Sequence, residues 1–101
     1  MKTQITFRHV KSHHPKLQDE ANSIMESFTK YTDEITSANV EFLNENNKTV
    51  IITVHMNGNV LVAKEETDDF HKSLNEASEK IIRQIKKVKT KQINSRTKKV
   101  S

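Results

Sequence analysis

Residues 65–91 constrain the fold of this chain more than any other stretch. Their apolar side chains recur every three or four positions, which is the spacing of one face of an α-helix. These residues are Phe70, Leu74, Ala77, Ile81, Ile85 and Val88. The short side chain of Thr67 or Asp68 could cap the first turn, because its oxygen can accept from free backbone N–H groups. We therefore predict an amphipathic helix that covers a hydrophobic core.

The charges of this helix are ordered along its length. Acidic residues lie near its start and basic residues fill its end, which suits the helix dipole. The basic residues are Lys80, Arg83, Lys86, Lys87, Lys89 and Lys91. Matching a dipole needs only one or two charges at each end, so the excess of bases indicates a binding partner.

Net charge along the chain narrows the class of that partner. Residues 1–79 hold eight basic and thirteen acidic residues, whereas residues 80–101 hold nine basic residues and no acidic one. A basic segment on a mildly acidic body indicates a polyanion, with nucleic acid as the first candidate. An anionic membrane fits less well, because the helix lacks an aromatic-rich apolar face. A tail that only increases solubility is the remaining alternative.

The rest of the chain predicts four strands and a second helix. Alternating or β-branched runs predict strands at residues 3–8, 38–43, 49–56 and 60–64. Pro15 and the helical spacing of apolar residues from Leu17 to Tyr31 predict the second helix. The Asn57-Gly58 pair predicts a tight hairpin, because both central residues of such a turn require positive φ.

The resulting order is β-α-β-β-β-α. The first two strands should be parallel, because a helix connects them, and the next two connections should be hairpins. We expect an α+β two-layer sandwich, in which both helices cover one face of a four-stranded mixed sheet. Alternation places Leu61 and Ala63 on the inner face and His55 on the outer face.

A length of 101 residues suffices for one domain with a single core. We predict a domain at residues 1–91 and a basic, mobile tail at residues 92–101, where no apolar period continues. The absence of cysteine excludes a disulfide framework and a thiolate metal site. With no signal peptide or membrane span evident, we expect a soluble cytoplasmic protein.

The sequence offers little for catalysis. Its only glycine lies in the hairpin, which excludes a glycine-rich phosphate loop. Four carboxylates lie at the start of the predicted helix, where acids are stabilised without a catalytic role. They are Glu65, Glu66, Asp68 and Asp69. We expect no enzyme, no catalytic residue, no cofactor and no small-molecule substrate.

The histidines raise the question of a metal site. His9, His13 and His14 lie close together, but they lack the further ligands with which zinc sites complete a set of four. His71 flanks Phe70, so we expect it to pack at the margin of the core. We therefore expect no metal site.

Helical geometry divides the bases of residues 65–91 into two groups. Each residue turns the helix by about 100°. One flank beside the buried stripe therefore holds Lys80, Arg83, Lys87 and Lys91, while Lys86 and Lys89 lie further round toward solvent. No aromatic residue is interleaved with them, which argues against stacking on single-stranded bases. Contact with backbone phosphates of structured RNA or DNA fits better.

Residues 66–85 also carry a more specific pattern. The chain reads Asp69-Phe70-His71, then Ser73-Leu74-Asn75, then Lys80-Ile81-Ile82-Arg83-Gln84-Ile85-Lys86-Lys87-Val88-Lys89. Together with the β-α-β-β-β-α order, this run closely resembles the ribosome hibernation-promoting factors, the family of the ribosome-associated inhibitor. The resemblance is ungapped, covers essentially the whole chain and implies the short form of the family.

The resemblance implies that residues 1–91 bind the small ribosomal subunit and its rRNA. It implies a translation inhibitor that occupies the mRNA and tRNA channel and promotes ribosome hibernation, a stress response. Its rRNA-binding residues would be Lys80, Arg83, Lys86, Lys87, Lys89 and Lys91. We expect the free protein to be a monomer that binds no membrane.

Two other functions remain open from the sequence. A general double-stranded RNA-binding module has an α-β-β-β-α order that is contained in this one, although its phosphate-binding lysines begin the last helix, where this chain is acidic. A structural protein whose sheet edge pairs with a partner is the second alternative, but it leaves the basic segment unexplained.

Overall fold

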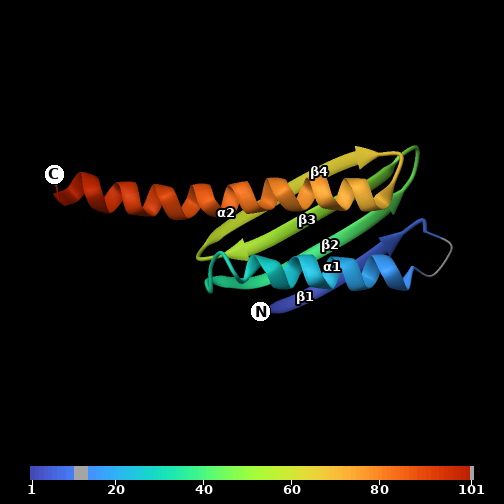
Figure 1. The fold of residues 1–101 in the computed structure, drawn as a ribbon, viewed down its shortest axis with the longest axis horizontal. Helices are drawn as coiled ribbons and strands as arrows, with labels where there is room; N and C mark the ends of the chain where they lie inside the picture. Colours follow the sequence, from blue (N-terminus) through green and yellow to red (C-terminus); the bar gives the residue numbers. More distant parts are fainter. Residues whose placement is uncertain (11–13, 101) are drawn as a thin grey trace.

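The computed structural model describes the backbone of residues 1–10 and 14–100, with side chains described as far as Lys89. Its elements are β1 (Lys2–Arg8), α1 (Pro15–Phe28), β2 (Ile35–Asn44), β3 (Lys48–Met56), β4 (Asn59–Thr67) and α2 (Phe70–Val100). The predicted order and α+β class are confirmed (Figure 1).

The four strands form one mixed sheet in the order β1-β2-β3-β4. β1 pairs parallel to β2, with α1 as the crossover, whereas β2–β3 and β3–β4 are antiparallel pairs. Both helices lie on the same face of the sheet and run in the same direction, so their N-termini share one end of the molecule (Figure 1). The opposite face of the sheet carries no helix.

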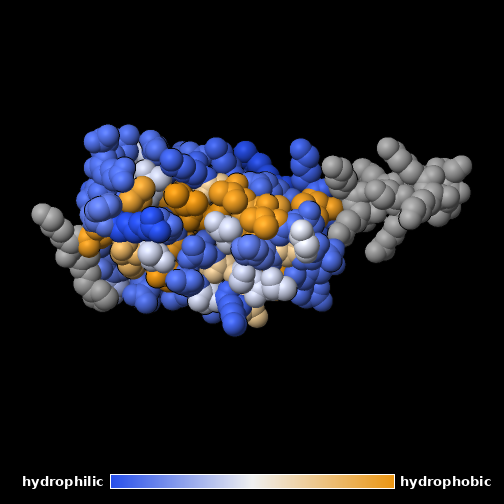
Figure 2. All heavy atoms as spheres, turned by 180° about the vertical axis from the view of Figure 1, so that it is seen from behind, coloured by the Kyte–Doolittle hydropathy of each residue, from blue (hydrophilic) through white to orange (hydrophobic). Residues whose placement is uncertain are grey.

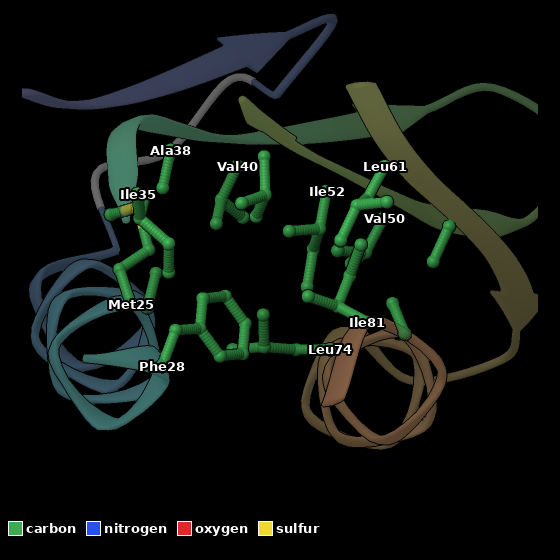
Figure 3. Close-up of a cluster of buried hydrophobic side chains, with 14 of the residues drawn as sticks. Met25, Phe28, Ile35, Ala38, Val40, Val50, Ile52, Leu61, Leu74 and Ile81 are labelled. Carbon is green, nitrogen blue, oxygen red and sulfur yellow. The ribbon is translucent and has the colours of Figure 1, made fainter. Parts of the chain in front are cut away.

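The core lies between the sheet and the two helices, where alternating strand residues meet one stripe of each helix (Figure 3). Every apolar residue of the predicted α2 stripe is buried except Val88, which is half-buried. The inward-facing apolar residues of β3 are all buried: Val50, Ile52, Val54 and Met56. In α1, Met25 is buried and Ile24 is only half-buried, so the stripe lies slightly to one side of the predicted one.

The hairpin between β3 and β4 has the predicted geometry. Asn57 has a φ of 48° and Gly58 a φ of 78°, which are the left-handed values that this turn requires. Leu61 and Ala63 point into the core as predicted, and His55 is exposed on the outer face.

The junction between β4 and α2 differs from the prediction. β4 continues to Thr67, because β3 begins at Lys48 and pairs with it there. Glu65 and Glu66 are therefore strand residues and do not begin a helix. The helix is capped by Asp69, whose Oδ1 accepts from the backbone N–H of His71 at 3.2 Å. The N-cap residue is thus Asp69 and not the predicted Thr67 or Asp68, although the Oγ1 of Thr67 accepts from the backbone N–H of Asp69 at 3.1 Å just before the helix.

α2 also continues beyond its predicted end at residue 91 and remains helical to Val100. The side chains of residues 90–101 lie outside those that the structure describes, so the separate mobile tail at residues 92–101 stays a prediction. Within the described chain, neither helix combines the length and apolar character needed to cross a membrane.

Candidate nucleic-acid interface

α2 is locked in rotation by its contacts with the sheet. Leu74, Ala77, Ile81 and Ile85 are completely buried against it. Near the helix start, the buried Ser73 donates its hydroxyl hydrogen to the carbonyl oxygen of Lys48 in β3 at 2.7 Å. Because the buried stripe fixes which side of α2 faces inward, it also fixes which side chains face solvent.

The flank of α2 beside β4 carries two free cations. Arg83 and Lys87 are exposed, and neither makes an ion pair or a side-chain hydrogen bond with the described part of the chain. Gln84 lies between them and donates to the carbonyl oxygen of Val62 at 3.0 Å, which ties this flank to the sheet edge. Arg83 and Lys87 are therefore available to an external anion.

Lys80 lies on the same flank but has a partner. Its Nζ pairs with Glu65 of β4, and the Lys80 side chain is 51% exposed. The Glu65 side chain is only 19% exposed, so solvent and salt screen this pair less than a fully exposed one. Lys80 is therefore less available to an external anion than Arg83 and Lys87.

The flank of α2 beside α1 is organised around Tyr31, which follows the last turn of α1. The Nζ of Lys86 lies 5.3 Å from the centroid of the Tyr31 ring, a cation–π distance. The Nζ of Lys89 donates to the Tyr31 carbonyl oxygen at 2.8 Å. Both lysines are exposed as predicted. Their ammonium groups also lie near the C-terminal end of α1, where the partial negative charge of the helix dipole favours cations.

Five of the six predicted basic residues can thus be placed, and they flank the exposed side of α2 on both edges. We call this set the basic arc: Lys80, Arg83, Lys86, Lys87 and Lys89. The side chain of Lys91 lies outside the described residues. The sequence did not identify Tyr31 as part of this site, because its apolar spacing assigned it only to the stripe of α1.

The histidines do not assemble a comparable site. His71 is exposed, and its Nδ1 lies 2.5 Å from Oε2 of Glu20, so it joins the two helices and does not pack at the core margin as predicted. His14 lies against the rings of Phe7 and Phe70. Among the described residues, no three potential metal ligands converge; His13 is outside them.

Comparison with known proteins identifies the family. A sequence model of the family described as sigma 54 modulation protein / S30EA ribosomal protein matches residues 3–93. The chain belongs to this family. The match confirms the resemblance inferred from the run in α2, because this is the ribosome-associated family to which that run points.

Two solved structures share the fold. The N-terminal domain of Protein Y from Thermus thermophilus superposes with a TM-score of 0.78 at 18% identity, covering 87% of this chain and 99% of that one. A ribosomal subunit interface protein from Coxiella burnetii gives a TM-score of 0.77 at 24% identity, covering 89% of this chain and 99% of its own. A search of curated protein sequences found no match.

Proposed function

We propose that this S30EA-family protein binds the small ribosomal subunit through the basic arc of α2, occupies the mRNA and tRNA channel and keeps idle ribosomes inactive. The observation that carries the proposal is the pair Arg83 and Lys87, which are exposed and have no side-chain partner among the described residues, on a helix held rigidly by the core. The family match over residues 3–93 suggests that the polyanion bound by these cations is the ribosome.

The chemistry of the basic arc suits phosphates better than bases. Its members are cations, and the ring nearest to them, that of Tyr31, has Lys86 over one face. Stacking on bases is therefore not its principal contact. Cations on two edges of one helix can reach phosphates on both sides, which positions a protein on folded RNA without reading its sequence. No catalytic residue or cofactor is part of this function.

The start of α2 distinguishes this function from a general double-stranded RNA-binding module. Such a module would use bases at the start of its last helix. Here Asp68 and Asp69 are exposed at that position, and Glu65 and Glu66 precede them in β4. Carboxylates repel phosphates, so the RNA-binding end of α2 is its later part.

Competition on purified small subunits tests the channel directly. Labelled protein bound to subunits should be displaced by mRNA together with tRNA, because the proposed site overlaps theirs. Double-stranded RNA of equal length should displace it only at much higher concentration. Displacement by any double-stranded RNA, with no extra effect of mRNA and tRNA, would favour the general RNA-binding module.

Tyr31 should support binding through Lys86. Replacing it by leucine keeps an apolar side chain but removes the ring beneath the ammonium group, a contact of about 0.5–1 kcal/mol at exposed sites. We expect the dissociation constant for small subunits to rise about two- to fivefold, because Lys86 is then less ordered before binding. Tyr31→Phe is the matched control and should bind like the unmodified protein. Equal losses in both variants would contradict a role of the ring.

A further inference from the structure

The outer face of the sheet, opposite both helices, carries an apolar row. Val60 and Val62 of β4 are 58% and 51% exposed, an unusual exposure for large apolar side chains in this molecule. The half-buried Ile51 of β3 and Leu43 of β2 continue the row. The strand register makes Ile51 a diagonal neighbour of both Val62 and Leu43. Figure 2 shows the resulting band of hydrophobic residues across this face.

Most of the charges on this face are paired. Arg8 pairs with Glu41 at 3.1 Å, and Lys64 lies 3.6 Å from Glu66. The exposed Lys2, which lines the edge of this face, is the cation left without an ion pair among the described residues. The face therefore offers phosphate fewer free cations than the basic arc. The only ring among the outward-facing strand residues is the imidazole of His55, so the face also lacks a platform for base stacking. Its chemistry suits protein better than RNA.

A shallow hollow beside the apolar row adds a hydrogen-bonding group. It has a volume of about 560 Å³ and is lined in part by Gln4, Asn39, Thr53 and His55. The Oδ1 atom of Asn39 is buried and has no hydrogen-bond partner among the described residues. That oxygen is closed to solvent, so it is not itself a docking group. The exposed amide of Gln4 and the half-buried hydroxyl of Thr53 also line the hollow and can form hydrogen bonds with the backbone of a protein partner.

We propose that the outer sheet face, defined by Leu43, Ile51, Val60, Val62 and the hollow at Asn39, docks an uncharged apolar segment of a ribosomal protein on the particle that the basic arc binds. This inference rests on the proposed function. The hydrogen bond from Gln84 to Val62 places the apolar row directly beside the free cations of α2. One large partner can therefore contact both surfaces.

A second copy of the chain is the alternative occupant, and the oligomeric state of the free protein tests it. The basic residues are concentrated in residues 80–101, so the binding that they direct is to a polyanion. A ribosomal particle is a polyanion overall and attracts the chain, while its protein components present apolar side chains and backbone amides. The apolar row and the basic arc thus suit the two components of one ribonucleoprotein.

The test compares two double variants on intact small subunits over a range of salt concentrations. Val60→Thr with Val62→Thr keeps the β-branched shape and the strand preference but makes the row polar. We expect affinity about tenfold lower at every salt concentration, with an unchanged salt slope, because apolar burial is lost and no phosphate contact is. Arg83→Gln with Lys87→Gln should instead reduce the slope.

A second measurement uses rRNA stripped of its proteins. The valine variant should bind this RNA like the unmodified protein, whereas the Arg83/Lys87 variant should bind it more weakly. Equal binding of the valine variant to intact subunits would overturn the docking proposal, as would a loss on stripped rRNA. Sedimentation of the free protein as a dimer that the valine variant abolishes would assign the face to a second copy. If the Arg83/Lys87 variant binds intact subunits with the affinity and salt slope of the unmodified protein, the proposed function is refuted.

Discussion

Replacing Arg83 and Lys87 by glutamate is expected to abolish inhibition of translation in a purified system while the protein remains folded. Both side chains are exposed and lie away from the buried stripe of α2, so the core does not depend on them. Each phosphate contact contributes roughly 0.7–0.9 to the slope of log affinity against log salt concentration. Loss of two contacts should therefore flatten the slope by about 1.5, and the new carboxylates add repulsion.

The control for this variant must change the net charge equally. Lys16→Glu with Lys72→Glu does so in the first turns of α1 and α2, at the opposite end of α1 from Tyr31 and the basic arc. This control should still inhibit translation at the concentration of the unmodified protein. Circular dichroism and thermal melting establish that both variants are folded. If the Arg83/Lys87 variant is folded and still inhibits, the basic arc is not the ribosome-binding surface.

Leu74→Ala should have the largest effect on stability. Leu74 is completely buried between α2, the sheet and the side chains of α1. Removing a buried leucine side chain typically lowers the free energy of unfolding by about 2–5 kcal/mol, because apolar contacts are lost and a cavity remains. Chemical denaturation measures this loss. The matched control is Asn75→Ala, one residue further along the helix and exposed, which should change stability by less than about 0.5 kcal/mol. A loss below about 1 kcal/mol for Leu74→Ala would contradict the burial of this face.

The fold could be predicted from the sequence because the local sequence patterns agree with one another. The 3.6-residue period of α2, the alternation in β3 and the Asn57-Gly58 turn each indicated the element that formed. The boundaries depended on pairing, which no local pattern reveals. Glu65 resembles a helix-start residue in the sequence, yet it is a strand residue because β3 offers a partner as far as Lys48.

The candidate site could be predicted only in part from the sequence. Helical geometry placed Arg83 and Lys87 on one flank with Lys80 and Lys91, and the structure has Arg83 and Lys87 exposed there. That this flank lies beside β4 was not predicted. The contacts of the other bases depend on which elements lie beside α2. Lys80 meets Glu65 only because β4 runs beneath it, and Lys86 meets Tyr31 only because α1 runs parallel to α2 and ends there. Whether the basic arc binds rRNA stays a prediction.

The position of α2 at the end of the chain order has a consequence for synthesis of the protein. During translation, β1 and α1 are made before β2, so β1 has no strand to pair with until β2 has been made. The inner face of the sheet stays exposed to solvent until α2 emerges and covers it. The stripe of α2 that closes the core lies on the same helix as the basic arc. A nascent chain therefore presents the cations of the basic arc in a fixed arrangement only once α2 has closed the core.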